Sequence, residues 1–357
     1  MTDKVYLPMT MNRAISLTLV CFFFSGLTGL MYEILWTRMI VQLIGSAPFA
    51  VSIVLAVFMG GLGLGGYIAG RTIDRINEPM RLIRIYGILE LMIGGYGLLL
   101  PLLLAAFRPL AAILYNQIYN HFVLYHFLIF VGCAIILCVP VVCMGATLPI
   151  LCRFHVTTLS HLGTRAGRLY GLNTIGAAAG SLLCGFWLIN HLGVWGTLIF
   201  AVLINAMIGM FCIFWSHRNG IEFTKAVNCS SATSIPEPPA EETRSSDYPG
   251  ELTGALVIFA VSGFCAMAYE VIWTRLLGLI VGPTTYSFTI VLVTFILGLA
   301  LGSMLFGWVA DRIGKALWLL ISTQVIAALL VLGISQLLGN SQFFLPNCTI
   351  TFRNSLP

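Results

Sequence analysis

Long apolar runs separated by short polar segments dominate the chain. Nine of these runs are long enough to cross a membrane, because a spanning helix needs about 20 mostly apolar residues. The runs cover residues 14–36, 44–70, 83–107, 122–150, 168–189, 194–215, 252–273, 283–309 and 316–338. They are too long for the strands of a membrane barrel. The pattern therefore predicts an all-α, polytopic transmembrane bundle of about nine helices.

One stretch of the chain occurs twice. Residues 25–38 read SGLTGLMYEILWTR and residues 262–275 read SGFCAMAYEVIWTR, at an offset of 237. The match continues without a gap to residues 76 and 313, and 20 of the 52 paired positions are identical. Shared hydrophobicity would not align the Tyr, Glu, Trp, Arg and Asp positions. The sequence therefore predicts an internal duplication.

The repeat and the polar segments divide the chain into four parts. A first half of six helices is expected over residues 1–215, followed by a Pro, Ser and Glu-rich segment, 216–250, that is typical of a disordered cytoplasmic linker. A partial second half of three helices covers residues 251–340, and residues 341–357 form an atypical tail. Since a complete duplication needs twelve helices, we expect the chain to be a truncated, frameshifted or split form of a longer protein.

Composition supports a membrane location and limits the partners. With 59% hydrophobic and 9% charged residues, the chain is predicted to lie in lipid. Fourteen of the 18 Lys and Arg residues lie in the N-terminus and every second loop after it. This bias predicts that the N-terminus lies on the cytoplasmic side of the membrane. The membrane itself is expected to be a plasma membrane, such as the bacterial inner membrane. The net charge of +5 thus indicates topology, and no nucleic-acid partner is expected.

The sequence gives no sign of a metal or cofactor site. Its ten cysteines are mostly scattered through apolar runs, without a CxxC pair and without histidines at metal-ligand spacing. The run GGLGLGG at 60–66 matches GxGxxG, but it lies within an apolar helix and not after a strand, so a dinucleotide loop is rejected. We interpret Gly61 and Gly65, with their counterparts Gly298 and Gly302, as a face for close helix packing.

The repeated motif contains the first candidate site residues. At about 100° per residue, Tyr32 and Trp36 lie one above the other on a helix, as do Tyr269 and Trp273. Two interpretations stay open for this motif. These aromatic residues could form an interfacial belt with Arg38 and Arg275 beside them, or the acids Glu33 and Glu270 could face the bundle interior and mark a solute path.

A partner for each motif acid must come from elsewhere, because Glu33 and Arg38 lie about 140° apart on their helix. We hypothesise symmetric pairs between the halves, Glu33 with Arg275 and Glu270 with Arg38. Two other polar residues lie in apolar runs. Glu90 is expected to face protein or water, in a functional or a structural role. Asn173 needs a hydrogen-bonding partner within a predicted packing face, and with the three acids it is a candidate for the substrate or ion path.

The loops after the second and eighth runs suggest conformational latches. The segment GWVADRIGK at 307–315 resembles the GxxADRxGRR loop of major facilitator superfamily (MFS) transporters. By this resemblance the candidate latch residues are Asp74, Arg75, Asp311 and Arg312. The alternative is that they are ordinary positive-inside anchors.

Three motifs that follow one another along the chain carry a wider resemblance. SGxxGLxYExxWTR, GATLPxLxR at 145–153 and GRLYxxNTxGAxxGS at 167–181 together resemble the membrane portion of fused MFS/spermidine synthase proteins. The resemblance implies an MFS-like membrane module associated with polyamine biosynthesis. The family's cytosolic aminopropyltransferase, which uses decarboxylated S-adenosylmethionine and a diamine, has no counterpart in this sequence. No catalytic residue is therefore assigned, and a separately encoded transferase is the expected partner.

Two other functions stay open. The chain could be a stand-alone secondary transporter that uses Glu33, Glu90 and Glu270 for a small cationic solute such as a polyamine. It could also be an inactive remnant. Oligomerisation is a possible source of further helices.

Overall fold

In the computed structural model the chain is all-α throughout the described residues, which are 9–76, 78–155, 162–232, 249–281, 285–313 and 318–336. The elements are α1 (Met9–Ile44), α2 (Ala47–Ile73), α3 (Pro79–Ile118), α4 (Phe122–His155), α5 (Leu162–Leu182), the π-helix η2 (Leu183–Leu188), α6 (Ile189–Ala232), α7 (Pro249–Val281) and α8 (Thr285–Ile313). A further helical span covers Trp318–Gln336. The prediction of an all-α bundle is confirmed for this part of the chain.

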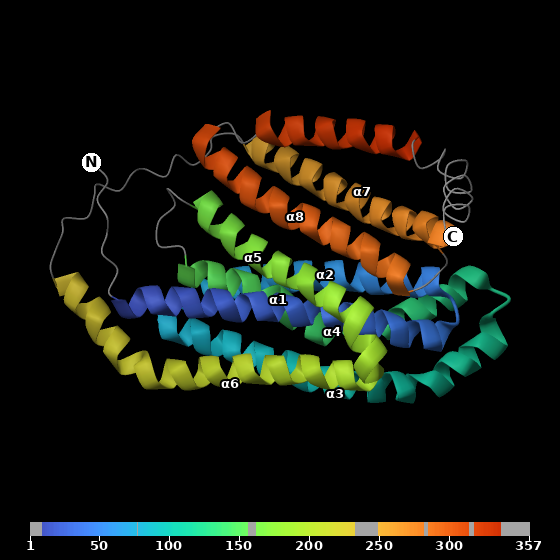
Figure 1. The fold of residues 1–357 in the computed structure, drawn as a ribbon, viewed down its shortest axis with the longest axis horizontal. Coiled ribbons are helices and arrows are strands. Elements are labelled where there is room, and N and C mark those ends of the chain that lie inside the picture. The colour runs from blue at the N-terminus through green and yellow to red at the C-terminus, as the bar shows by residue number, and fades with distance from the viewer. Residues whose placement is uncertain are drawn as a thin grey trace, which may run out of the picture.

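Eight helical segments of the described residues are long and apolar enough to cross a membrane. One of them, Ala166–Arg218, has 53 residues and would extend roughly 80 Å at about 1.5 Å per residue. The chain turns back within this segment (Figure 1). The helix is broken at Gly193, whose φ of 67° and ψ of −178° suit glycine alone. The predicted runs 168–189 and 194–215 are thus the two arms of this one segment.

Helix α1 is the centre of the first half. It packs against α2, α5 and α6, while α3 packs against α4 and α6, and α2 packs against α4. Figure 1 shows α1 between α5 and α6. The motif side chains on α1 are consequently among the least exposed in the protein, with Met31, Leu35 and Ile40 fully buried.

The predicted glycine packing is confirmed in the first copy of the repeat. A Cβ at Gly65 would lie 2.1 Å from the Val142 carbonyl oxygen on α4, so only glycine permits this approach. The face of α5 packs as closely on α1, where a Cβ at Gly176 would lie 2.0 Å from the Phe23 carbonyl oxygen. In the second copy, Gly298 and Gly302 face open space, so their predicted packing is not formed among the described residues.

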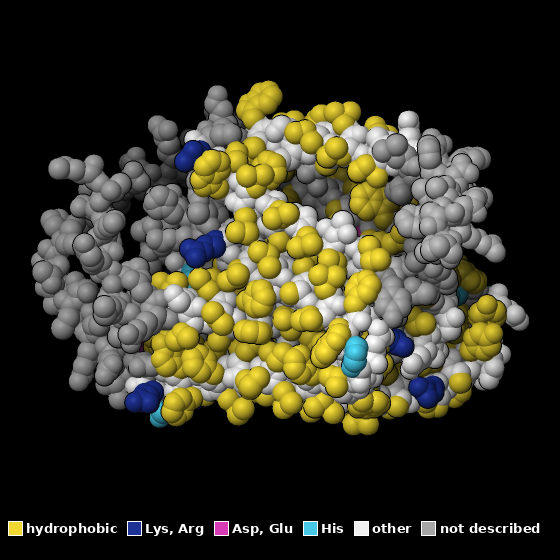
Figure 2. All heavy atoms as spheres, viewed as in Figure 1, with side chains coloured by type: hydrophobic (Ala, Val, Ile, Leu, Met, Phe, Trp, Pro, Cys, Tyr) yellow, Lys and Arg dark blue, Asp and Glu magenta, His cyan; other side chains and the backbone are white. Residues whose placement is uncertain are grey.

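The second half is covered on one side only. Helix α8 packs against α5, and α7 packs against α8 (Figure 1). Large apolar side chains such as Phe259, Phe264 and Trp318 are more than two-thirds exposed. Hydrophobic side chains also cover the middle of the face in Figure 2, with Lys and Arg toward its ends. A surface of this kind is typical of contact with lipid.

The predicted linker differs from the expectation in its first part. Helix α6 continues through residues 216–232 and ends at Ala232. This segment contains no proline, and the first proline after it is Pro236, so no proline interrupts the helix before that point. Residues 233–248, like the tail 341–357, lie outside the described residues.

Candidate functional site

The aromatic residues of the motif are buried in the first copy. Tyr32 and Trp36 have no exposed surface, and their rings stack with centroids 5.2 Å apart, as the i, i+4 spacing predicts. The rings of Tyr269 and Trp273 also stack, at 6.1 Å, but these side chains are half-buried. The interpretation as an interfacial belt is therefore wrong for α1, because its aromatic pair faces protein and not the membrane interface.

The motif acids approach each other across the two halves. Glu33 on α1 and Glu270 on α7 are each 1% exposed, and their carboxyl groups are close enough to interact electrostatically. Both oxygens of Glu270 and Oε1 of Glu33 are buried and accept no hydrogen bond within the described part of the chain. A buried carboxyl group without a hydrogen-bonding partner is costly. This cost favours a role for the pair other than stabilising the fold.

The hypothesised ion pairs between the halves are not formed. Arg38 and Arg275 line a cavity that the acids do not line, and neither arginine makes an ion pair among the described residues. Within each copy, the five-residue spacing turns the arginine about 140° away from the acid, so the two groups lie on different faces of the helix. The structure thus separates the acids and the arginines of the motif into two neighbouring groups.

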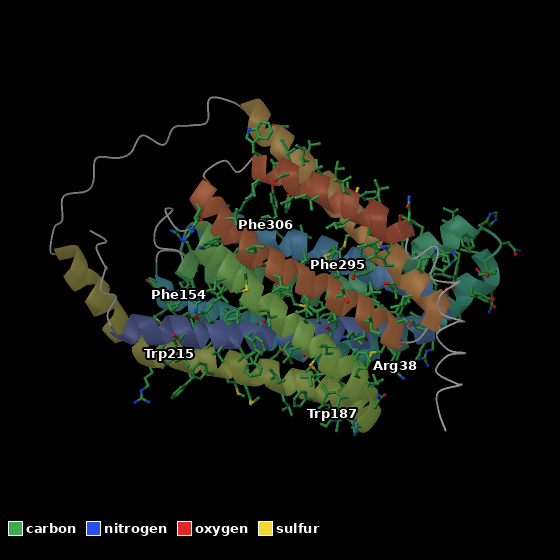
Figure 3. The ribbon with its side chains drawn as sticks, turned by 45° about the horizontal axis from the view of Figure 1, so that its top comes forward. Arg38, Phe154, Trp187, Trp215, Phe295 and Phe306 are labelled. Carbon is green, nitrogen blue, oxygen red and sulfur yellow. The ribbon has the colours of Figure 1, made fainter. Side chains whose placement is uncertain are left out.

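A cavity of about 690 Å³ lies between the two copies of the repeat. Its walls come from the C-terminal part of α1, the start of α2, the C-terminal part of α7 and the start of α8. Ten of its fifteen lining residues form five pairs at the repeat offset of 237: Ile34/Val271, Thr37/Thr274, Arg38/Arg275, Val41/Gly278 and Val51/Phe288. Figure 3 shows Arg38 toward this end of the bundle. The duplication therefore builds the cavity from matching residues.

The threonines of the cavity are held by their own helices. Thr37 Oγ1 donates to the Glu33 carbonyl oxygen at 2.7 Å, and Thr274 Oγ1 donates to the Glu270 carbonyl oxygen at 2.8 Å. Each hydroxyl proton is therefore engaged within its helix. The guanidinium groups remain the hydrogen-bond donors of this matched set that are free to meet a ligand.

Glu90 belongs to a separate polar cluster inside the first half. Its Oε1 accepts a hydrogen bond of 2.5 Å from Ser25 Oγ on α1, and its Oε2 accepts one of 2.7 Å from Asn205 Nδ2 on α6. Tyr32 OH lies 3.5 Å from Asn205 Oδ1, and the buried Tyr86 hydroxyl is beside the carboxyl group. Glu90 is fully buried, so the expectation that it faces protein is confirmed.

The remaining candidates lie apart from both groups. Asn173 Nδ2 donates a hydrogen bond of 2.9 Å to the Phe22 carbonyl oxygen, which ties α5 to α1. Asp74 and Arg75 are exposed just after the end of α2. The guanidinium group of Arg312 stacks on the Trp308 ring at 4.0 Å from its centroid. The Asp311 side chain lies outside the described residues, so the latch stays a prediction.

Sequence reasoning missed Ser25 and Asn205. Ser25 is the first residue of the repeated motif and has an identical counterpart at Ser262. Asn205 is an amide within the apolar run LINAMIG, and a polar residue inside a membrane helix usually bonds to another helix. Both signals were present in the sequence, but only the structure shows that they converge on Glu90.

Comparison of the chain with protein-family models, with curated proteins and with solved structures finds no match. The architecture and the exposed apolar surface make it a polytopic helical membrane protein. Its more specific role has to be inferred from the cavity and the buried acids.

Proposed function

We propose that this membrane protein binds a small organic solute in the cavity between the two copies of its repeat and carries it across the bilayer. The cavity of about 690 Å³, with five pairs of equivalent lining residues, is the observation that carries the proposal. Solute sites of duplicated transporters lie at the interface between repeats. The volume is also within the range of about 300–1,000 Å³ that is usual for small-molecule sites.

The three motifs that resemble fused MFS/spermidine synthase proteins support a finer version of this role. The first motif is on α1 and α7 and supplies both acids and both arginines. The third motif is on α5, which packs closely on α1 through Gly176 and Gly180. In this version the protein is the membrane module of a polyamine biosynthesis system and works with a separately encoded aminopropyltransferase.

The alternative of a stand-alone transporter for a cationic solute has its own support. Glu33 and Glu270 are both buried, lie within electrostatic range of each other, and have no hydrogen-bonding partners for three of their four oxygens. Acids at membrane depth are suited to a cationic amine or to protons. The two versions differ in partner and in solute, but they share the cavity as the binding site.

The shared claim is tested by filling the cavity. Val41 lines it, so we expect Val41→Trp to abolish solute binding and uptake in proteoliposomes. The matched control is Val123→Trp, because Val123 on α4 is 80% exposed and does not line the cavity. The solutes are spermidine, putrescine and a panel of organic acids. Equal binding by both variants, or no binding of any solute by the wild type, would contradict the proposal.

The finer version is tested through the partner. The tagged protein is purified from its native membranes under mild conditions, and the eluate is assayed for transfer of an aminopropyl group from decarboxylated S-adenosylmethionine to putrescine. Activity that co-purifies with the protein, and is absent from an untagged control, supports the biosynthetic role. Its absence leaves the transporter as the preferred version.

A further inference from the structure

The residues that line the cavity between the repeats include two arginines and no acid. Arg38 and Arg275 occupy equivalent positions of the two copies, and both line it. The fifteen lining residues include no Asp or Glu, and the acids Glu33 and Glu270 lie behind the walls. Among the described residues, neither guanidinium group donates a hydrogen bond to the protein or forms an ion pair. Both are therefore available to a ligand.

The position of these arginines also runs against the distribution of charge along the chain. Only four of the 18 Lys and Arg residues lie in the segments that the positive-inside rule places outside, and Arg38 and Arg275 are two of the four. Topology therefore does not account for them. Their duplication, and their convergence on one cavity from α1 and α7, indicates a binding role.

The remaining walls define the rest of the ligand. They are largely apolar, with Phe49, Val51, Val271 and Phe288 among the lining side chains. Guanidinium groups form paired hydrogen bonds with carboxylate and phosphate groups, which a cationic ligand cannot accept. The chemistry that fits is an anionic head group on an apolar body.

We infer that the cavity takes an amphiphilic organic anion, whose carboxylate or phosphate group is held between Arg38 and Arg275. This inference rests on the proposed function, since it names the class of solute for the same site. It keeps the binding site that the two finer versions share, but it replaces the cationic solute of those versions by an anion. The anion has two possible sources, a free organic acid and an anionic membrane lipid, and both offer the same chemistry.

The test uses ligands that differ only in their head group. The full-length protein is placed in nanodiscs of phosphatidylcholine, and binding of octanoate, octyl phosphate, octan-1-ol and octylamine is measured by calorimetry, with spermidine as a further ligand. We expect octanoate and octyl phosphate to bind about tenfold or more tightly than octan-1-ol, because charge-assisted hydrogen bonds are the strong ones. Octylamine and spermidine are expected to bind more weakly still.

The variants assign the effect to the arginines. Arg38→Gln and Arg275→Gln are each expected to remove most of the preference for the anions, while Arg38→Lys retains part of it because the charge remains. The matched control is Arg108→Gln, since Arg108 is an exposed arginine on α3 that does not line the cavity. Unchanged thermal unfolding of the two Gln variants separates loss of binding from loss of folding.

The outcomes separate the inference from the function on which it rests. Tighter binding of octylamine or spermidine than of octanoate, or equal binding of all head groups, overturns the anion while the binding site stands. No binding of any ligand overturns both. Nanodiscs that contain phosphatidylglycerol distinguish the sources. If this lipid displaces octanoate from the wild type and from the Arg108→Gln control alike, the anion is a lipid head group. If it displaces octanoate from neither, the anion is a free acid.

Discussion

Tyr32 and Glu33 are neighbours in the sequence, yet their side chains reach different parts of the protein. The Tyr32 hydroxyl lies 3.5 Å from Asn205 Oδ1 in the Glu90 cluster, whereas the Glu33 carboxyl group interacts with that of Glu270 on α7. Consecutive residues on a helix point about 100° apart, so one turn of α1 can contact both groups. A movement of α1 would therefore change the surroundings of both groups at once.

The Glu90 cluster is expected to contribute to stability. Asn205→Ala removes the donor to Glu90 Oε2 and leaves that buried oxygen without this partner. We expect a loss of roughly 0.5–2 kcal/mol in the free energy of unfolding, the range for hydrogen bonds between membrane helices. Unfolding in mild detergent provides the measurement, with Asn120→Ala in the exposed α3–α4 turn as the control. A loss no larger than that of the control would show that the bond contributes nothing.

Glu270 and Glu90 are expected to respond in opposite ways to the same substitution. Both oxygens of Glu270 are buried without a hydrogen bond, so Glu270→Met removes a costly group and should raise the unfolding temperature. Glu90→Met removes an acceptor of two hydrogen bonds and should lower it. In the free energy of unfolding, each change should amount to about 1 kcal/mol or more.

The comparison is made by heating both variants beside the wild type in the same detergent. We also expect Glu270→Met to reduce solute uptake, because stabilising substitutions at functional sites usually cost activity. Equal destabilisation of the two variants would contradict the expectation, because it would mean that Glu270 stabilises the fold as Glu90 does.

The two copies of the repeat provide a matched pair for testing helix packing. Gly65→Val would force a side chain into the Val142 backbone, whereas Gly302→Val would enter open space. We expect a loss of about 1–3 kcal/mol or more for Gly65→Val, as for other overpacked sites, and little change for Gly302→Val. Thermal unfolding of the two variants provides the measurement. Similar losses of stability would mean that the Gly302 face is also covered in the membrane.

The orientation in the membrane can be tested at two exposed turns. The charge bias predicts Glu78, between α2 and α3, on the cytoplasmic side and Asn120, between α3 and α4, on the outer side. In a background without native cysteines, a membrane-impermeant maleimide added to intact cells should label Asn120→Cys and not Glu78→Cys. The reverse pattern would invert the topology.

Much of the fold follows from local sequence, and there are physical reasons why the sequence does not predict the rest. The helices, the Tyr32–Trp36 stack and the close packing at Gly65 depend on periodicity and on small residues, which one chain displays directly. The partners of the acids depend on how distant helices meet. The sequence pattern led to ion pairs with Arg38 and Arg275, while the structure buries Glu33 and Glu270 within electrostatic range of each other and has both arginines lining a cavity.

The two walls of the cavity are equivalent in origin but no longer equal in shape. Val41 on one side corresponds to Gly278 on the other, and Val51 corresponds to the larger Phe288. Two identical walls would accept an asymmetric molecule in either of two opposite orientations. The divergence of these two pairs removes that degeneracy, so a bound molecule would enter and leave the cavity with a defined end first.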